Sequence, residues 1–400
     1  MKILYVTTKL PFGHTEAFAI SEINALQRAG HEVRLAPCTT PGDIVHGDAA
    51  QLLPLTHVEP LISRNILNGL GAELRRAPRH SLRAVAKTLG ERKRTSLKNA
   101  AVAPKGAWLA GVARAWGADH IHAYWASTPA TVALIASEIA GVPWSFTAHR
   151  WDIEENNLLS EKVSSSSFAR FISQDGLDDA YALGISQLAE KATVIRMGVE
   201  LEVDTAHEGS AHSTRSDARP TIICPASLIP RKGLTYLIDA ASRLRAQGHD
   251  FRVMLAGQGE QRGELERLVA EQALGGHIQF MGQVSHEKLI NMYRSGQVDI
   301  VVMPSLHEGI SVAIIEAMSY GVPAVTTAVG GMPELLAEGR GLLVPSKDAA
   351  HLADALENLL VNPELRASMG ERGKAHVFAE YAIETTVARM VAQFEAAQHA

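Results

Sequence analysis

Residues 298–334 read VDIVVMPSLHEGISVAIIEAMSYGVPAVTTAVGGMPE. The stretch begins with the apolar run 298–302, which predicts a buried strand of a parallel sheet. A short loop follows, and residues 311–320 have the composition of a helix that Gly321 ends. A strand, a turn and a helix in this order predict an α/β fold with a parallel sheet.

The same stretch then repeats this order. Residues 322–327 predict a second strand, the glycine pair 330–331 predicts a turn, and Pro333 opens another helix. Both helices would direct free backbone N–H groups and the positive end of a helix dipole toward one place, which suits a diphosphate. Glu308 and Glu316, on either side of the first turn, are able to accept hydrogen bonds from sugar hydroxyls. We therefore expect a site for a sugar nucleotide.

The composition is that of an ordinary globular chain. Its 400 residues are 46% hydrophobic and 20% charged, and a chain of this length predicts two domains. The net charge of -5 gives no reason to expect a nucleic-acid partner. The two cysteines, Cys38 and Cys224, argue against a disulfide framework and a cysteine-based zinc site, and they fit the reducing cytoplasm. The first residues read as a strand and not as a signal peptide, and no apolar run has transmembrane length.

Two α/β patterns follow one another along the chain. A strand over 2–7, a helix over 16–28 and a strand over 33–35 predict a doubly wound first domain. A polar stretch without periodicity separates it from a second start of the pattern at residue 221. The predicted organisation is a first domain over 1–200, a linker over 201–219, a second domain over 220–375 and a C-terminal helix over 376–400 that packs back on the first domain.

Residues 64–105 depart from the average composition. They contain eleven Lys and Arg but only two acidic residues, Glu73 and Glu91, and leucines recur at helical spacing. One interpretation is a solvated, basic helical insertion in the first domain. The other is a surface that touches anionic lipid or a lipid-diphosphate acceptor, with the protein bound peripherally to the inner face of the membrane. The residues alone leave both interpretations open.

One histidine occupies a position where ligand residues often stand. His149 follows the predicted strand 144–147, and the carboxyl end of a strand is where doubly wound folds bind their ligands. A lone histidine of this kind is also often a structural residue with its hydrogen bonds satisfied. The position predicts either a site residue or a core residue.

The chain resembles a known family, the retaining glycosyltransferases of family 4 with the GT-B fold, also called group 1 glycosyltransferases. The most specific match is the pair Glu308 and Glu316, set within PSLHEG and EAMSYGVPAV and followed by GGMPE. The resemblance implies two Rossmann-like domains that face a central cleft, with the donor nucleotide held mostly by the second domain. Further matching stretches are spread along the chain, at 30–33, 147–149 with Asp152, 197–199, 231–233, 256–259 and 280–282.

The resemblance also implies roles for particular residues. Glu316 would hold the ribose hydroxyls of a nucleoside diphosphate of the UDP or GDP type, and Glu308 would contact the donor sugar. Lys232 would neutralise the departing diphosphate, and His149 would face the donor sugar from the first domain. The expected catalytic residues are therefore His149, Lys232 and Glu308. The residues expected at the donor nucleotide are Gly13, Arg231, Lys232, Gly257, Gly309, Ile310, Ser311, Val312 and Glu316.

Two departures from the family pattern concern the phosphates and the acceptor. The family usually has an arginine in a Gly-Arg-Leu segment that grips the diphosphate, whereas this chain has Ser227 there, and we hypothesise that Arg231 replaces it. The loop after the first strand reads FGHTE over 12–16 and lacks the usual Gly-Gly pair. No Asp-x-Asp metal motif occurs in the sequence. Because Lys232 and backbone amides supply positive charge, we expect neither a metal nor a cofactor.

The expected activity is retaining transfer of a hexosyl group from a nucleoside diphosphate sugar to an acceptor hydroxyl. In the family, the reaction is thought to occur on one face of the sugar, and a leaving phosphate oxygen helps to deprotonate the acceptor. Sugar, lipid-linked and small-molecule acceptors fit, as in bacterial polysaccharide, glycolipid or natural-product glycoside synthesis. Two alternatives remain: a GT-B disaccharide synthase or phosphorylase, and a catalytically silent sugar-nucleotide-binding module.

Overall fold

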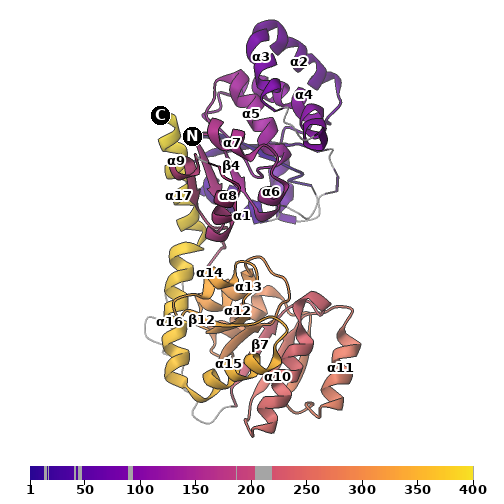
Figure 1. The fold of residues 1–400 in the computed structure, drawn as a ribbon, viewed down its shortest axis with the longest axis vertical. Coiled ribbons are helices and arrows are strands. Elements are labelled where there is room, and N and C mark those ends of the chain that lie inside the picture. The colour runs from indigo at the N-terminus through magenta and orange to yellow at the C-terminus, as the bar shows by residue number, and fades with distance from the viewer. Residues whose placement is uncertain are drawn as a thin grey trace. The chain divides into compact units, whose positions relative to one another are not determined.

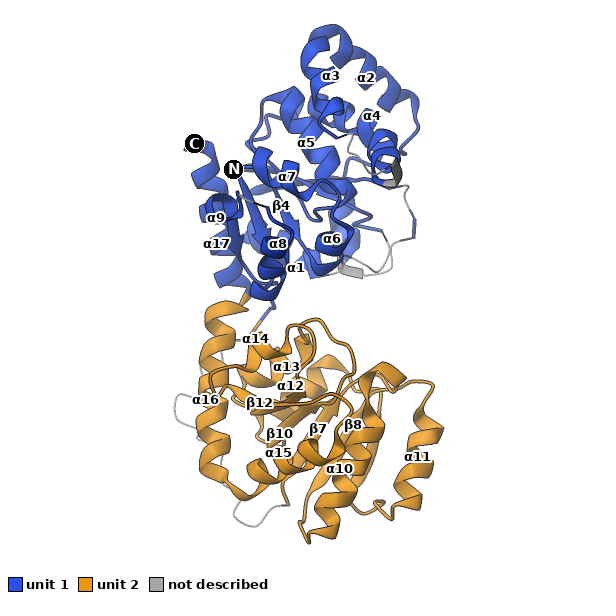
Figure 2. Ribbon diagram, viewed as in Figure 1, with its two compact units in different colours: residues 1–200, 383–400 blue, residues 201–382 orange. Residues whose placement is uncertain are grey.

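A computed structural model of the chain describes residues 1–12, 16, 18–39, 42–43, 47–88, 93–185, 187–202 and 219–399. The chain divides into two compact units, residues 1–200 with 383–400 and residues 201–382 (Figure 2). Residue 376, the predicted start of the C-terminal helix, lies inside α16 (Pro363–Glu380), and the first unit resumes with α17 (Ile383–His399). Most of the predicted linker lies outside the described residues. In the described parts of the chain, no helix combines the length and apolar composition needed to cross a bilayer.

The first unit contains a six-stranded parallel sheet in the order β2-β1-β3-β4-β5-β6. Strand β1 pairs with β2 on one side and with β3 on the other, so the strand order reverses between β1 and β3. Doubly wound folds bind ligands at such a reversal, beside the carboxyl ends of the strands. The strands are β1 (Lys2–Thr7), β2 (Glu32–Pro37), β3 (His120–Ala123), β4 (Trp144–Ala148), β5 (Phe168–Phe171) and β6 (Ala192–Val194).

Helices cover both faces of this sheet. Alternate residues of β1 point to opposite faces, so that Leu4 belongs to a core with α4 and α5, whereas Tyr5 belongs to a core with α1 and α17. Phe394 of α17 packs against the ring of His120, with 4.9 Å between ring centroids. The helices around the sheet are α1 (Phe18–Arg28), α5 (Thr128–Ala140), α6 (Arg150–Glu155), α7 (Leu159–Ser165), α8 (Gln174–Ala182), α9 (Leu188–Lys191) and α17.

Additional helices separate β2 from β3. They are the 3-10 helix η1 (Gly47–Leu55) and the α-helices α2 (Arg64–Arg76), α3 (Pro78–Ala86) and α4 (Lys93–Trp116). The three α-helices lie side by side, and α4 packs on α5 (Figure 1). A Cβ on Gly106 of α4 would meet the Ile135 Cβ of α5 at 2.7 Å, so glycine permits this close approach. The basic segment 64–105 is therefore mainly helical in the part that the structure describes.

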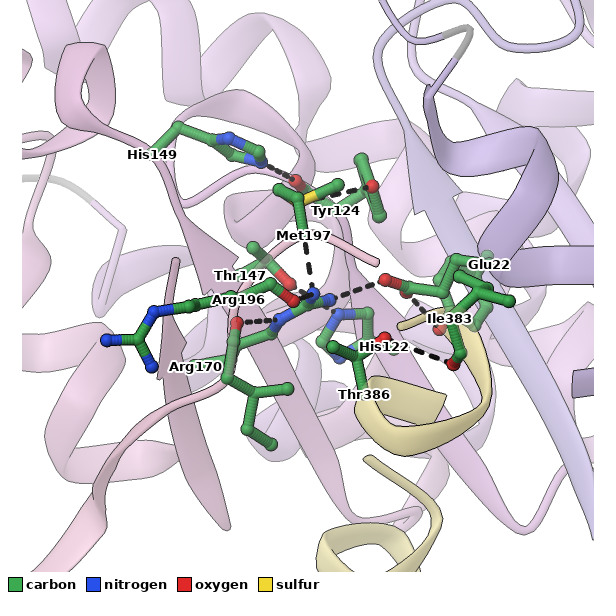
Figure 3. A network of polar contacts seen from close by, with 12 residues as sticks. Glu22, His122, Tyr124, Thr147, His149, Arg170, Arg196, Met197, Ile383 and Thr386 are labelled. Carbon is green, nitrogen blue, oxygen red and sulfur yellow. Dashed lines mark hydrogen bonds and ion pairs between the residues drawn. The ribbon is translucent and has the colours of Figure 1, made fainter. Parts of the chain in front are cut away.

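A buried ion pair holds the chain where it leaves the first unit (Figure 3). Arg170 of β5 and Glu22 of α1 are both buried, and Arg170 Nη1 lies 2.6 Å from Glu22 Oε2. The Arg170 guanidinium also donates to the carbonyls of Ile195 and Arg196, at 2.8 and 2.7 Å. Tyr5 OH donates to the other Glu22 oxygen at 2.9 Å. Both charges are therefore compensated by several partners, which a buried ion pair requires.

The second unit contains another six-stranded parallel sheet, in the order β12-β11-β10-β7-β8-β9. Its strand order reverses between β7 and β10. The strands are β7 (Thr221–Pro225), β8 (Arg252–Ala256), β9 (Ile278–Gly282), β10 (Ile300–Met303), β11 (Ala324–Thr327) and β12 (Gly341–Val344). The helices are η2 (Pro230–Lys232), α10 (Leu234–Ala246), α11 (Arg262–Glu271), α12 (His286–Arg294), α13 (Val312–Ser319), α14 (Met332–Leu336), α15 (Ala349–Val361) and α16.

The strands predicted over 2–7, 33–35, 144–147, 298–302 and 322–327 correspond to β1, β2, β4, β10 and β11, whereas β12 is not predicted. Strand β12 is at the edge of its sheet, begins with Gly341 and exposes Leu343. A short edge strand that contains glycine has a weak pattern of alternating burial. Apart from this omission, the prediction of an α/β chain with two Rossmann-like sheets is confirmed.

Candidate functional site

The reversal between β7 and β10 brings together two loops that are far apart in sequence. Lys232 lies in the loop after β7, at the end of η2, and Glu308 lies in the loop after β10. Lys232 Nζ lies 2.5 Å from Glu308 Oε2, and the two side chains are 12% and 13% exposed. The carboxyl edge of this sheet therefore holds a partly shielded ion pair at the position where such folds bind ligands.

A glycine allows the two loops to approach. Gly233 follows Lys232 with a φ of +64°, and a Cβ there would lie 2.2 Å from the Pro304 carbonyl oxygen. Both the backbone conformation and the lack of space exclude a side chain at this position. The Leu306 N–H donates to the Arg231 carbonyl at 2.7 Å and joins the same loops. The placement of the Lys232 side chain thus depends on the glycine that follows it.

The Glu308 carboxylate is oriented by its own loop. Ser305 Oγ donates to Glu308 Oε2 at 3.0 Å, and Thr327 Oγ1 donates to the Ser305 carbonyl at 2.5 Å. Gly330 covers this loop, because a Cβ there would lie 1.8 Å from the Glu308 carbonyl oxygen. The hydrogen-bond partners of the carboxylate in the described chain are Lys232 and Ser305, not the first turn of α13.

The N-terminus of α13 presents backbone N–H groups near this carboxylate. Helix α13 begins at Val312, and the Ser311 side chain forms no capping hydrogen bond. Among the described residues, none accepts a hydrogen bond from the N–H groups of Gly309, Ile310 or Ser311. Free N–H groups at a helix N-terminus favour anions. Four of the residues expected at the donor nucleotide, Gly309, Ile310, Ser311 and Val312, therefore lie together at the start of the helix.

Glu316 lies one turn further along α13 and has a partner that the sequence does not indicate. His286 Nε2, at the start of α12, lies 2.9 Å from Glu316 Oε1. The His286 side chain is 70% exposed, whereas that of Glu316 is 14% exposed. His286 follows the helix cap Ser285, and no spacing pattern relates it to a residue 30 positions later. The pair offers a donor and acceptors to ligand hydroxyls.

Arg231 and Gly257 differ in their surroundings, since Arg231 is exposed and Gly257 is packed between two loops. The Arg231 side chain is exposed, as is Ser227, which stands where the resembled family has arginine. Gly257 follows β8, and a Cβ there would lie 2.0 Å from the Ala226 carbonyl oxygen. The packing of two loops therefore requires Gly257, whatever it binds. The replacement of the missing arginine by Arg231 stays a prediction.

In the first unit, His149 is a buried ring with extensive contacts. Its Nε2 lies 3.1 Å from the Tyr124 carbonyl oxygen, and its ring packs against Trp125 with centroids 4.1 Å apart. Its backbone N–H donates to the Asp152 carboxylate at 3.1 Å. Burial, together with the positive charge of Arg170, lowers the pKa of His149 to about 3, so the imidazole is neutral at physiological pH. These are the contacts of a structural histidine, and its expected contact with a donor sugar stays a prediction.

Glu16 is a buried carboxylate that the sequence does not single out. It fixes the loop after β1 and the indole that packs on His149. The predicted ligand residue Gly13 lies outside the described residues. The sequence feature that could have indicated Glu16 is its position three residues after Gly13, in a loop on the ligand side of the sheet. The Glu16 carboxylate accepts hydrogen bonds, at 2.6 to 2.8 Å, from the backbone N–H groups of Thr8, Lys9 and Leu10 and from Trp125 Nε1.

Two family models match the chain. The model described as glycosyl transferases group 1 matches residues 208–376, and the glycosyl transferase 4-like domain matches residues 18–203. The D-inositol 3-phosphate glycosyltransferase of Corynebacterium urealyticum is 30% identical over 305 residues, which are 68% of this chain and 70% of that protein. The chain belongs to the group 1 glycosyl transferases.

Another curated protein matches this group 1 transferase over a shorter stretch. The alpha-D-kanosaminyltransferase of Streptomyces kanamyceticus is 34% identical over 168 residues. The match covers 42% of this chain and 43% of that protein, so it spans less than half of the relative's length.

Solved structures share the architecture of this group 1 transferase. Anabaena Alr3699/HepE in complex with UDP has a TM-score of 0.70 at 20% identity, over 99% of this chain and 100% of its own. A glycosyltransferase from Rickettsia africae has a TM-score of 0.67 at 17% identity, over 99% of this chain and 98% of its own. At these identities the likeness concerns the fold, and it confirms the two-domain GT-B prediction.

Proposed function

We propose that this group 1 transferase moves a hexosyl group from a nucleoside diphosphate sugar to an acceptor hydroxyl. The observation that carries the proposal is the Lys232–Glu308 ion pair beside the N-terminus of α13, in a chain of this family. A cation, a carboxylate and free backbone N–H groups converge at one edge of a sheet. A sugar diphosphate needs these three kinds of group.

Lys232 acts on the leaving group. Breaking the bond between sugar and phosphate builds negative charge on the departing diphosphate, and fixed positive groups stabilise that charge. The Lys232 ammonium and the N–H groups of Gly309, Ile310 and Ser311 supply them. Because an ammonium has three donors, Lys232 is able to contact Glu308 and a phosphate oxygen together. This positive charge is the basis for proposing that transfer requires no metal.

Glu308 orients the donor sugar. Lys232 and Ser305 both bond its Oε2 atom, and a carboxylate has about four acceptor positions in all, so others serve sugar hydroxyls. A carboxylate fixed in this way is suited to positioning. We therefore assign no nucleophile, and propose that the acceptor attacks on the face from which the phosphate leaves. A leaving phosphate oxygen then helps to take the acceptor proton, and the anomeric configuration is retained.

The residues at the same edge of the sheet support a class of nucleotide, and the matched relatives support a class of acceptor. Glu316, with His286 beside it, binds the ribose hydroxyls of a UDP or GDP sugar. The matched relatives include proteins named for D-inositol 3-phosphate and for GDP-mannose with a phosphatidylinositol mannoside, and a solved structure contains UDP-glucose. We propose a polyhydroxylated acceptor, free or lipid-linked, in polysaccharide, glycolipid or glycoside synthesis. Cys38 and Cys224 are buried thiols, which suits a cytoplasmic protein.

A donor screen tests the proposal. Purified protein is heated with UDP, GDP, ADP and TDP sugars, since a ligand that binds the folded state raises the melting temperature. The best donor is then incubated with sugar, inositol and lipid-linked acceptors, and products are identified by mass spectrometry and NMR. We expect one donor class to stabilise the protein and to yield a product with the donor's anomeric configuration.

Other outcomes distinguish the alternatives. A donor that binds but is neither hydrolysed nor transferred would indicate a silent sugar-nucleotide-binding module. Turnover that requires free phosphate would indicate a phosphorylase, and transfer only to a free monosaccharide would indicate a disaccharide synthase. An inverted product would exclude reaction on one face of the sugar.

A further inference from the structure

Helices α2 and α3 expose leucine side chains among arginines. Leu67 is 56% exposed and Leu82 is 64% exposed. Exposed apolar side chains that gather on a protein surface often mark an interaction site. We call the exposed faces of these two helices the arginine–leucine surface, which comprises Arg64, Leu67, Arg75, Arg79, Leu82 and Arg83.

In α3 the exposed residues form one stripe. Arg79, Leu82 and Arg83 are spaced three and four residues apart, so they share a face of the helix, and all three are exposed. Ser81 and Ala84 are buried on the other side. A leucine between two arginines is therefore directed away from the core of the unit.

In α2 the same division occurs. Leu67 and Leu74 lie two turns apart on one face and are exposed, and Arg75 follows beside them. Ile66 and Glu73, each about 100° around the helix from the leucine that follows it, are buried. The core of the unit therefore leaves Leu67, Leu74 and Leu82 uncovered.

Few carboxylates balance the charge on this surface, and one of them, Glu59, accepts hydrogen bonds from Ser63 and Asn65 at the start of α2. Glu73, the acidic residue in α2 and α3, is buried and paired with Arg114. Two lysines of the segment 64–105 are paired, Lys87 with Glu138 and Lys98 with Glu155. Within the described chain, no acidic side chain pairs with the exposed arginines Arg64, Arg75, Arg76, Arg79 and Arg83.

We propose that the arginine–leucine surface docks on an anionic lipid bilayer. The arginines would pair with lipid phosphates, and the leucines would enter the boundary between headgroups and acyl chains. A solvated basic helix needs no exposed leucines, and a nucleic acid offers them no apolar layer. The chemistry therefore favours lipid among anionic partners. This docking is independent of the proposed transfer reaction, because it uses no residue of the donor site.

A vesicle-binding experiment tests the proposal. The full chain is mixed with vesicles of phosphatidylcholine containing one anionic phospholipid, or of phosphatidylcholine alone, and the bound fraction is measured by flotation. We expect binding to the anionic vesicles that weakens as salt screens the charges. The variant Arg75→Gln/Arg79→Gln/Arg83→Gln should bind roughly a hundredfold more weakly, at about fivefold per cation near the surface. The variant Leu67→Gln/Leu82→Gln should lose about tenfold through the lost apolar contact.

A matched variant on the second unit is the control. Arg243→Gln/Arg267→Gln/Val361→Gln replaces exposed side chains of α10, α11 and α15 and should bind vesicles like the parent chain. Circular dichroism melting verifies that each variant is folded. The proposal is overturned if the parent chain does not bind anionic vesicles, or if it binds neutral vesicles equally well. It is also overturned if the leucine variant binds like the parent, which would indicate a charge-only surface for an acidic protein or a nucleic acid.

Discussion

The two sheets have the same doubly wound arrangement. The polar side chains at their carboxyl edges differ, however, in their hydrogen-bond partners and in their exposure. In the second unit, Lys232 and Glu308 bond to one another and keep part of each side chain accessible. In the first unit, Glu16 is saturated by four N–H donors and His149 is buried under its neighbours. Partly exposed charges can exchange water for a ligand, whereas a saturated buried carboxylate fixes loop geometry. The side chains at the edge of the second sheet are therefore suited to ligand binding, whereas those at the edge of the first sheet hold the loops in place.

The largest effect should come from opening the buried ion pair of the first unit. Arg170→Met leaves the Glu22 carboxylate buried without its cation, and we expect the free energy of unfolding to fall by about 3–5 kcal/mol. Urea unfolding measures the change. The control is Arg150→Met, which breaks an exposed pair with Glu154 and should cost less than about 1 kcal/mol. Equal effects for the two substitutions would show that burial of the pair is unimportant.

The next effect tests the second unit. Lys232→Ala should lower kcat by about 100- to 1000-fold, because it removes a fixed cation from the leaving diphosphate. Steady-state kinetics with the donor found by the screen give the value, and the melting temperature should change little. The matched control is Arg267→Ala, an exposed cation of α11 in the same unit, for which kcat should be unchanged. An active Lys232→Ala enzyme would remove this residue from the mechanism.

A smaller effect concerns the pH dependence of the first unit. Burial lowers the pKa of His120 and of His149 to about 3, so the folded state stays unprotonated where the unfolded chain takes up protons. Stability from each histidine is complete above the unfolded pKa near 6.5 and is lost as the pH falls toward about 3. Between pH 7 and pH 5 this amounts to about 2 kcal/mol per histidine. Asp152 acts in the opposite direction, since burial raises its pKa to about 6.

Urea unfolding at several pH values tests this dependence. His149→Gln should reduce the loss of stability between pH 7 and pH 5 by about 2 kcal/mol, with Arg170 and Asp152 still present beside the site. His80→Gln, an exposed position of α3, is the control and should leave the pH dependence unchanged. If His149→Gln keeps the full slope, the folded His149 ring takes up a proton and is not the rigid, neutral group described here.

The smallest effect distinguishes donor binding from chemistry at the second edge. His286→Ala should raise KM for the donor about three- to tenfold and leave kcat nearly unchanged, because His286 bonds Glu316, one turn along α13, and not Lys232 or Glu308. His249→Ala is a control, since this histidine pairs with Glu357 elsewhere in the unit. A fall in kcat with constant KM would place His286 at the reacting atoms.

The sequence predicted the elements well because each is a local pattern. The apolar run before Pro304, the glycine that ends the helix at Gly321 and the glycine pair at 330–331 all correspond to observed strands and turns. Strand β12 was not predicted, because Gly341 and an exposed Leu343 leave it without a clear alternation of apolar and polar residues. Local periodicity detects burial on one face of an element, and this edge strand lacks that signal.

The sequence predicted which residue types form the candidate site, but it did not predict which of these side chains contact one another. Glu308 could be named from its place in the turn after a predicted strand, whereas Lys232 was named from the resemblance to the family. Their contact across 76 residues depends on β7 and β10 being neighbours, which is a property of strand order. The pairing of His286 with Glu316 depends likewise on how α12 packs beside α13.

The sequence by itself therefore determined the α/β class, the two Rossmann-like sheets and the residue types of the candidate site. Only the tertiary structure decided that His149 is buried and neutral, that Glu16 holds the Trp125 indole, and that leucines of α2 and α3 remain uncovered. The physical reason is that strand and helix formation follow from spacing along the chain. Burial, pKa and ion pairing depend on which distant elements pack together, and no local pattern records that.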